Sequence, residues 1–213
     1  MPIKQVYVPD CEADDVIGYI ARHKFTSNKI VIVSSDKDLY QLLSDRVTQW
    51  SPGQKKFIAP DDVRQKFHVP VSNFCLARAF IGDPSDSIPG VPGAGFKSLT
   101  RLFPDLSQRE VTIDEVVEAA QIKSEKRRAT KLSKNVAVSK DLVNRNWRLM
   151  YLDIINLSAK QIERIEYLVE LQEYTRDKMK LYRQMRREGV TTFDVDSFFS
   201  KTSVLARKDD NGI

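Results

Sequence analysis

The chain has 213 residues, which is enough for one domain-sized hydrophobic core or two small ones. Its 41% hydrophobic and 30% charged residues are typical of a soluble globular protein, and no apolar run is long enough to span a membrane, so we expect no membrane partner. The two cysteines, Cys11 and Cys75, exclude a disulfide framework or a Cys-rich zinc site and favour a reducing, cytoplasmic setting, while the net charge of +5 favours a polyanionic partner.

The first 70 residues alternate helix and strand signals. Apolar residues at Val16, Ile17, Ile20 and Ala21 have the spacing of a buried helical stripe. Residues 29–35, KIVIVSS, are a continuous β-branched run, which is typical of a strand buried on both faces of a parallel sheet. The further elements expected here are a helix over 38–43, strands over 47–50 and 55–59, and a helix over 60–67 that begins at Pro60. This alternation predicts an α/β unit.

From residue 71 onward the strand signals fade and helices dominate. The sequence predicts a helix over 72–82, a turn-rich loop over 83–95 and a second helix over 96–103. Further helices are expected over 111–121, 124–141 and 158–188, and residues 206–213 are expected to be frayed.

A basic segment over residues 121–148 holds nine Lys or Arg residues against two acids, so its net charge of +7 exceeds that of the whole chain. The ordinary alternative is a solvated helix face, and the functional reading is a nucleic-acid contact. The residues at its start that we select as DNA-binding candidates are Lys123, Lys126, Arg127, Arg128 and Lys131.

Acidic residues gather at three separate places: Glu12, Asp14 and Asp15 at a helix entrance, Asp36 and Asp38 after the first strand, and Asp83 and Asp86 in the loop over 83–95. Each acid alone has a structural explanation as a helix cap, a turn residue or a partner of the helix dipole. Their positions favour a common site, because open α/β sheets bind ligands beyond the carboxyl ends of their strands. Oxygen ligands without nearby His or Cys suit Mg²⁺ or Mn²⁺, and two such ions can hydrolyse a phosphodiester.

The loop GVPGAGFK carries a different chemistry. Gly90, Gly93 and Gly95 permit positive φ angles and the close approach of another backbone, and Lys97 follows at a helix start. A glycine-rich turn that enters a helix can hold a phosphate through its N–H groups, directly or through a monovalent cation. Many helix–helix corners look similar, and no GxxxxGK[ST] motif is present, so nucleotide hydrolysis by a P-loop is not expected.

Taken together, EADD, VSSDKD and GDPSDSIPGVPGAGFKS resemble the 5′ nuclease superfamily of flap endonucleases, 5′–3′ exonuclease domains of bacterial DNA polymerases and phage ribonuclease H enzymes. The stretch SSDKDLYQLLSDRVTQWSPGQKKF looks most like the tailed-phage ribonuclease H branch. The match is specific over residues 8–103 and general over the helical remainder.

The resemblance implies a PIN-like α/β fold followed by a helix–three-turn–helix DNA-binding element, with two Mg²⁺ or Mn²⁺ ions and duplex, nicked or flapped DNA, or RNA–DNA, as the substrate. It implies a C-terminal part of a nuclease domain over residues 1–70 and a helical region over 71–213, with the DNA-binding element over about 71–103. The implied catalytic metal ligands are Glu12, Asp14, Asp15, Asp36, Asp38, Asp83 and Asp86. The implied DNA-binding hairpin residues are Gly90, Val91, Gly93, Gly95 and Lys97.

The chain departs from the family at its start. Family members open with a strand that carries another metal-binding Asp, followed by a second Asp and a Lys- and Arg-rich helical arch, whereas only MPIKQVYVPD precedes EADD here. The chain thus resembles the C-terminal portion of such a nuclease: half of a split enzyme, a truncated product or a DNA-binding fragment. Without the first strand the sheet should expose an unpaired edge, and we expect a complementing chain or self-association to cover it.

The leading prediction is therefore a metal-dependent 5′–3′ exonuclease or flap endonuclease that acts in replication or repair. The alternative from another class is a non-catalytic DNA-binding module built on the hairpin and the basic segment. A toxin-like PIN ribonuclease shares the fold, but it has no reason to carry the glycine hairpin or the helical extension.

Overall fold

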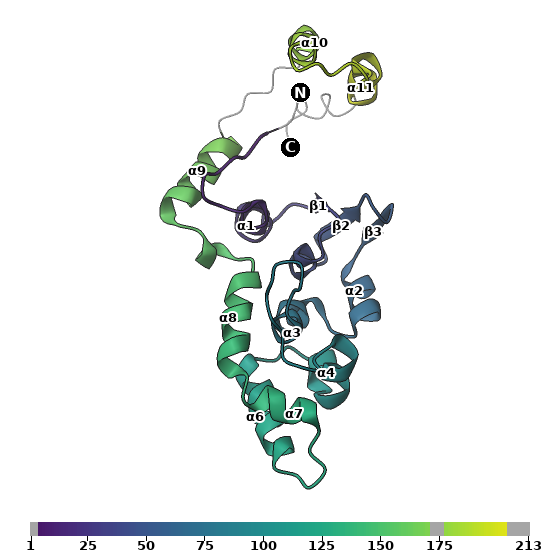
Figure 1. Ribbon diagram of the computed structural model, residues 1–213. Helices are drawn as coiled ribbons and strands as arrows, with labels where there is room; N and C mark the ends of the chain where they lie inside the picture. The colour runs from purple at the N-terminus through teal and green to yellow at the C-terminus, as the bar shows by residue number, and fades with distance from the viewer. Residues whose placement is uncertain (1–3, 171–176, 204–213) are drawn as a thin grey trace. The chain divides into compact units, whose positions relative to one another are not determined.

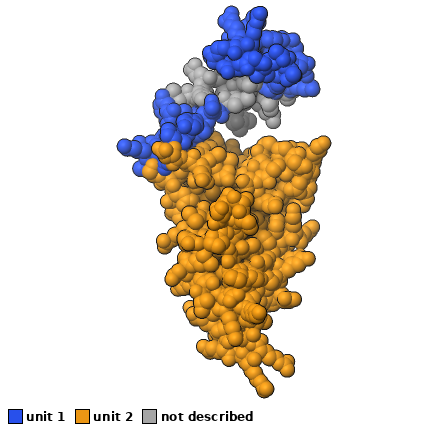
Figure 2. Space-filling view, in the orientation of Figure 1, with its two compact units in different colours: residues 1–9, 159–213 blue, residues 10–158 orange. Residues whose placement is uncertain are grey.

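The computed structural model describes residues 4–170 and 177–203, in two compact units (Figures 1 and 2). Residues 10–158 form what we call the main unit, and residues 1–9 with 159–213 form the terminal unit. Part of the helix expected over 158–188 and the whole of the tail expected to be frayed lie outside the described residues. The boundary expected near residue 70 does not coincide with the boundary between these units, because one hydrophobic core joins the residues on both sides of it. The division at residue 70 stays a prediction.

The sheet of the main unit has three strands in the order β1, β2, β3. β1 (Ile30–Val33) runs parallel to β2 (Val47–Ser51), and β2 runs antiparallel to β3 (Lys56–Ile58). The strands are where the sequence predicts them, but the expectation that β1 is buried on both faces is wrong. Val31 and Val33 are 53% and 67% exposed, since they lie on the face of β1 opposite the one from which Ile30 and Ile32 pack against the core.

Helix α1 (Ala13–Tyr19) begins directly after Glu12 and continues into a π-helical turn, η1 (Ile20–Lys24), as the apolar spacing predicts. The segment expected as a helix over 38–43 is a short 3₁₀ helix, η2 (Asp38–Leu42). Helix α2 (Pro60–Phe67) has its proline at the first helical position, where the missing N–H group costs nothing.

The helical half of the main unit packs around α3, which is fully apolar on the side that faces the core. Phe74, Phe80 and Leu99 are buried, and the rings of Phe67, Phe74 and Phe96 contact one another between α2, α3 and α4. The elements are η3 (Val71–Asn73), α3 (Phe74–Ile81), α4 (Phe96–Leu102), α5 (Asp105–Gln108), α6 (Ile113–Ser124), α7 (Lys131–Ala137), α8 (Lys140–Met150) and η4 (Ile154–Asn156).

The single helix expected over 124–141 is wrong. The structure has a loop over 125–130, then α7, and then the start of α8. Thr130 begins α7 as its N-cap, because its hydroxyl oxygen accepts a hydrogen bond from the Ser133 N–H at 3.0 Å. The β-branched and hydroxyl residues at the boundaries break the helical run that the Lys-rich composition suggested.

The terminal unit contains α9 (Ala159–Glu170), α10 (Lys178–Arg187) and α11 (Val195–Lys201). Helices α10 and α11 pack against each other, with an ion pair between Lys178 and Asp196 and a hydrogen bond of 2.9 Å from the Tyr182 hydroxyl to Asp196. None of the helices in the described part of the chain is both long and apolar enough to cross a membrane.

Candidate metal centre and nucleic-acid interface

The first part of the site is a tight turn at the carboxyl end of β1. The Asp36 N–H donates to Ser34 Oγ at 3.0 Å, and the Asp38 N–H donates to Asp36 Oδ1 at 2.9 Å. Below the turn, the fully buried Gln49 donates through Nε2 to the carbonyl oxygens of Ser34 at 2.8 Å and Asp36 at 2.7 Å. Gln49 fixes the backbone that carries both acids, and sequence reasoning did not select it because its role is only visible once β2 lies beside β1.

The second part is the loop after α3, which carries Asp83 and Asp86. The N–H group of Asp83 donates to the Ile88 carbonyl oxygen at 2.9 Å, and the Ile88 N–H group donates to the Asp83 carbonyl oxygen at 2.8 Å. This isolated antiparallel β-bridge closes the loop. The Ser85 N–H and hydroxyl both donate to Asp83 Oδ1, at 2.9 and 2.5 Å. These bonds hold the buried Asp83 carboxylate in one orientation.

The two parts meet. Asp38, Asp83 and Asp86 each offer a carboxylate oxygen, and the three oxygens lie within 4.8 Å of one another. Asp38 is half-buried, Asp83 is buried and Asp86 is exposed, so the group opens to solvent on one side. We call these three residues with Asp14 and Asp36 the acidic cluster.

Asp14, at the entrance of α1, lies close to the same acids. Burial, followed by the nearby charges of Asp36, Asp38, Glu12 and Asp15, raises the pKa of the Asp14 carboxyl to about 6. The two other acids at the entrance of α1 have different surroundings. Asp15 accepts a hydrogen bond from Asn156 at 3.1 Å, and Glu12 is an exposed N-cap residue that makes no side-chain cap hydrogen bond.

Arg78 of α3 stands between the two parts of the cluster. Its Nη2 atom pairs with Asp38 Oδ1 at 2.9 Å and also with Asp83, and its side chain is largely buried. Burial raises the pKa of Asp38, although Arg78 partly opposes this shift. Burial also opposes ionisation of Asp83, but the hydrogen bonds from Ser85 and Arg78 outweigh it and hold the pKa of Asp83 below its usual range. Sequence reasoning missed Arg78, because only the tertiary structure brings the two acids to one guanidinium.

The donor set fits a hard divalent cation. The converging ligand atoms are carboxylate oxygens, and no His or Cys is among the residues that come together in the described chain. Burial and, after it, the crowded negative charge raise the pKa of Asp14, and a bound cation would relieve both effects. The cluster is therefore compatible with divalent-metal binding.

The glycine hairpin over 90–95 owes its shape to close backbone contact. The Val91 N–H donates to the Phe80 carbonyl oxygen at 2.7 Å, and a Cβ at Gly90 would overlap the carbonyl group of Ile81. Only Gly93 has the positive φ, +85°, that the sequence analysis allowed for all three glycines, and Gly95 is extended. The hairpin is held from behind by Asn135 of α7, whose Nδ2 donates to the Pro92 carbonyl oxygen at 2.9 Å.

One hairpin residue requires a correction. Val91 was selected as a DNA contact, but it is 3% exposed and belongs to the hydrophobic core. Its role is to anchor the hairpin to α3, because its N–H group is already bonded to Phe80. Lys97, by contrast, is exposed at the start of α4. The exposed or half-exposed basic residues at the end of α6, in the following loop and at the start of α7 are Lys123, Lys126, Arg127, Arg128 and Lys131.

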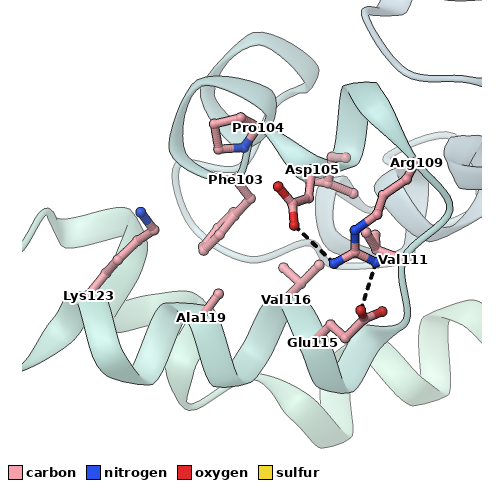
Figure 3. Close-up of a pocket in the computed structure, with 10 residues that line it drawn as sticks. Phe103, Pro104, Asp105, Arg109, Val111, Glu115, Val116, Ala119 and Lys123 are labelled. Atoms are coloured by element: carbon pink, nitrogen blue, oxygen red, sulfur yellow. Dashed lines mark hydrogen bonds and ion pairs between the residues drawn. The ribbon is translucent and has the colours of Figure 1, made fainter.

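A cavity of about 240 Å³ lies elsewhere, between the α4–α5 corner and α6 (Figure 3). Its walls are mostly apolar, with Phe103 and Val116 pointing inward, and Arg109 forms ion pairs with Asp105 at 2.9 Å and Glu115 at 2.7 Å at one end. It shares no residue with the acidic cluster, so the candidate site is an open acidic surface and not this cavity.

Comparison with known proteins shows which family the N-terminal part of the chain is similar to. Residues 1–68 match the family described as 5′-3′ exonuclease, N-terminal resolvase-like domain. Over these residues the chain is similar to the 5′ nuclease superfamily. The DNA polymerase I of Rhizobium leguminosarum is 37% identical over 135 residues, which are 62% of this chain and 13% of the polymerase. The 5′-3′ exonuclease of Buchnera aphidicola subsp. Schizaphis graminum is 35% identical over 102 residues, which are 47% of this chain and 35% of that protein.

Solved structures agree on the fold. The T5 5′-exonuclease with bound divalent zinc ions matches with a TM-score of 0.63 and 23% identity, over 76% of this chain and 60% of that chain. A bacteriophage T5 flap endonuclease in a complex with DNA and metal ions matches with a TM-score of 0.62 and 22% identity, over 75% of this chain and 59% of that chain. The chain thus shares the T5 enzyme's fold, and the matched residues span about a third of the Buchnera exonuclease.

Proposed function

We propose that this chain is the metal-binding and DNA-binding portion of a 5′–3′ exonuclease or flap endonuclease of the phage ribonuclease H type. It would hydrolyse phosphodiesters near the 5′ ends of DNA or RNA–DNA during replication or repair, in the cytoplasm of a cell or of a phage host. The observation that carries the proposal is the convergence of Asp38, Asp83 and Asp86 within 4.8 Å at the carboxyl end of β1. The relatives named as exonucleases and the T5 structures with DNA and metal ions support it.

The residues would divide the work as follows. Asp38, Asp83 and Asp86 would hold one Mg²⁺ or Mn²⁺ ion, and Asp14 and Asp36 would turn toward a second. Such ions supply a hydroxide nucleophile at neutral pH and stabilise the departing oxygen. Glu12 and Asp15 stand at the entrance of α1, from which they would orient the solvation of the ions. Ser85 and Arg78 fix Asp83, so its carboxylate needs little reorganisation.

The substrate backbone would lie on the hairpin side of the main unit. Lys97 and the Gly93 N–H group would contact phosphate, with a monovalent cation as a bridge, because the Ala94 and Gly95 N–H groups already donate within the chain. The basic residues between α6 and α7 would extend this contact along a duplex. Such contacts position a backbone without reading its sequence, which suits an enzyme that recognises ends, nicks and flaps.

A partner is proposed at the free edge of β1. In a parallel pair, alternate residues turn their N–H and C=O groups to opposite sides, and the even-numbered Ile30 and Ser34 donate to the β2 side. The groups of Val31 and Val33 therefore face away from β2, and their side chains are exposed. A complementing strand or a second copy would pair with these backbone groups. Replacing Val31 and Val33 by lysine, which puts charge on the edge strand, should abolish any dimer or complex seen by sedimentation.

The deciding experiment is cleavage of 5′-labelled flapped and nicked duplexes in MgCl₂ or MnCl₂, with wild type, Asp36→Ala and Asp61→Asn. Asp36 belongs to the acidic cluster, whereas Asp61 is exposed at the start of α2. We expect Asp36→Ala to lower the cleavage rate by at least about 100-fold and Asp61→Asn to leave it unchanged. Equal rates for all three would refute the proposal.

The second candidate is a non-catalytic DNA-binding module. The observation in its favour is that Arg78 already pairs with both Asp38 and Asp83 and offsets part of their charge, which helps the cluster persist without a metal. Binding of the flapped duplex with no metal-dependent cleavage, unaffected by Asp36→Ala, would select this alternative.

A further inference from the structure

Helix α10 in the terminal unit has an unusual charge pattern. Its ten residues, KMKLYRQMRR, hold five cations and no acid. Neither the acidic cluster nor the glycine hairpin uses this helix, and it was expected from the sequence only as part of a longer helix.

The cations of α10 are sorted onto one side. With about 100° between successive residues, Lys180, Arg183, Arg186 and Arg187 fall within an arc of roughly 120°. The opposite side holds Leu181 and Met185, which are half-buried where α10 packs against α11. We call the four exposed cations the α10 cationic face.

Three of the four cations on this face make no ion pair with the described residues. Arg187 binds Glu188 at 3.0 Å, and Lys178, on the other side of the helix, binds Asp196. Lys180, Arg183 and Arg186 make no ion pair with the residues that the structure describes. The helix dipole explains a preference for cations in the last turn, at Arg186 and Arg187, but it does not explain Lys180 at the start of the helix.

The composition of the face selects its partner. A helix that lies in a membrane surface needs an exposed apolar side, but Leu181 and Met185 are half-buried. Of the exposed large hydrophobic residues of α10, Met179 lies among the cations and Tyr182 is bonded through its hydroxyl to Asp196. A row of Arg and Lys without an apolar stripe suits the phosphates of a nucleic-acid backbone.

We propose that the α10 cationic face is a second phosphate-binding surface for DNA, carried by the terminal unit and independent of the glycine hairpin. It takes its ligand class from the proposed nuclease function and adds a contact outside the main unit. Its role is to hold the substrate backbone, so it contributes to affinity and not to the chemical step.

The test is the salt dependence of DNA binding by the full chain, measured by fluorescence anisotropy with a labelled flapped duplex in EDTA. The test variant is Lys180→Gln/Arg183→Gln/Arg186→Gln. The matched control, Lys29→Gln/Lys55→Gln/Lys66→Gln, removes three exposed cations from the main unit. We expect the test variant to lose about 0.9 in the slope of log K against log salt for each lost contact, with roughly tenfold weaker binding, and the control to keep the wild-type slope.

Other outcomes are equally decisive. A test variant that binds like wild type, or a control that loses as much as the test variant, would overturn the proposal. Loss of binding to phosphatidylserine vesicles without loss of DNA binding would assign the face to a membrane instead and would also overturn it. Circular dichroism checks that both variants keep the wild-type helix content.

The experiment separates this proposal from the nuclease function. Binding in EDTA does not depend on catalysis, so a chain that never cleaves can still show or lack the α10 contact. If wild type does cleave, the test variant should retain the wild-type rate at saturating DNA, because its substitutions leave the acidic cluster intact. A lower rate at saturation would mean that α10 does more than bind.

Discussion

The acidic cluster draws its side chains from the entrance of α1, the end of β1 and the loop after α3, whereas the α10 cationic face takes its cations from consecutive turns of one helix. Like charges are gathered in both regions. In the cluster they are crowded, partly buried and held by Arg78, so each residue depends on the others. On α10 the charges are exposed to water and screened, so each should act nearly alone.

The largest effect should come from Asp83→Asn. Asp83 contacts Arg78, Ser85 and the other acids, and its substitution removes a ligand atom and an anchor together. We expect metal-dependent cleavage to fall by at least about 100-fold, and calorimetric titration with Mn²⁺ to show weaker binding. Retained activity with unchanged Mn²⁺ affinity would show that the cluster is not the metal site.

The scaffold of the site is tested by a pair of glycine substitutions. A Cβ at Gly90 would overlap the Ile81 carbonyl group, whereas Gly93 has open space and only a positive φ. We expect Gly90→Ala to lower the free energy of unfolding by about 3 kcal/mol or more and Gly93→Ala by about 1 kcal/mol. Denaturant unfolding measures both changes in the free energy of unfolding, and equal losses would contradict the close approach of Gly90 to the Ile81 carbonyl group.

Arg78→Gln tests whether Arg78 stabilises the acidic cluster when no metal is bound. Its loss leaves Asp38 and Asp83 facing each other with one cation fewer, so we expect the metal-free chain to be destabilised by about 1–3 kcal/mol. Arg78→Lys, which keeps the charge, should lose less. Thermal unfolding in EDTA and in MgCl₂ gives the comparison, and a loss that Mg²⁺ fails to reduce would argue against competition between Arg78 and the metal.

Asp14 predicts a pH dependence of stability. Its pKa is raised to about 6 in the folded chain, so the folded state binds the proton more tightly than the unfolded state does. The charged carboxylate therefore destabilises the metal-free chain above pH about 6, and this penalty disappears as the pH falls toward the ordinary Asp pKa of about 4. Asp14→Asn should raise the melting temperature in EDTA at neutral pH, and the gain should vanish near pH 4; Asp61→Asn is the control.

The smallest effects should be those on α10. Arg183→Gln alone should reduce the salt slope by about 0.9, and adding Lys180→Gln should reduce it by the same amount again. In the cluster, the paired substitution of Asp38 and Asp83 should cost far less than the sum of the single changes, because both residues share Arg78. Non-additive slopes on α10 would remove the distinction between the two regions.

Much of the fold could be predicted from local patterns. The stripe beginning at Val16, the β-branched run of β1 and the proline start of α2 each specify one element through the nearest neighbours in the chain. The errors arose where the tertiary context decides. Val31 and Val33 have the composition of doubly buried residues but are exposed, and Val91 looks like a loop residue but is part of the core. The division of residues 124–141 depended on the Thr130 cap.

The sequence by itself determined which acids are candidates, because the spacing within each motif and the charge of each segment are one-dimensional properties, as is the run of cations on α10. Only the tertiary structure decided that Asp38, Asp83 and Asp86 meet, that Gln49 supports the turn beneath them and that Arg78 stands between them. The physical reason is that electrostatic and hydrogen-bond energies depend on distances through space. Residues such as Asp36 and Gln49, 13 positions apart, or Asp38 and Arg78, 40 positions apart, acquire those distances only when β1, β2 and α3 pack together.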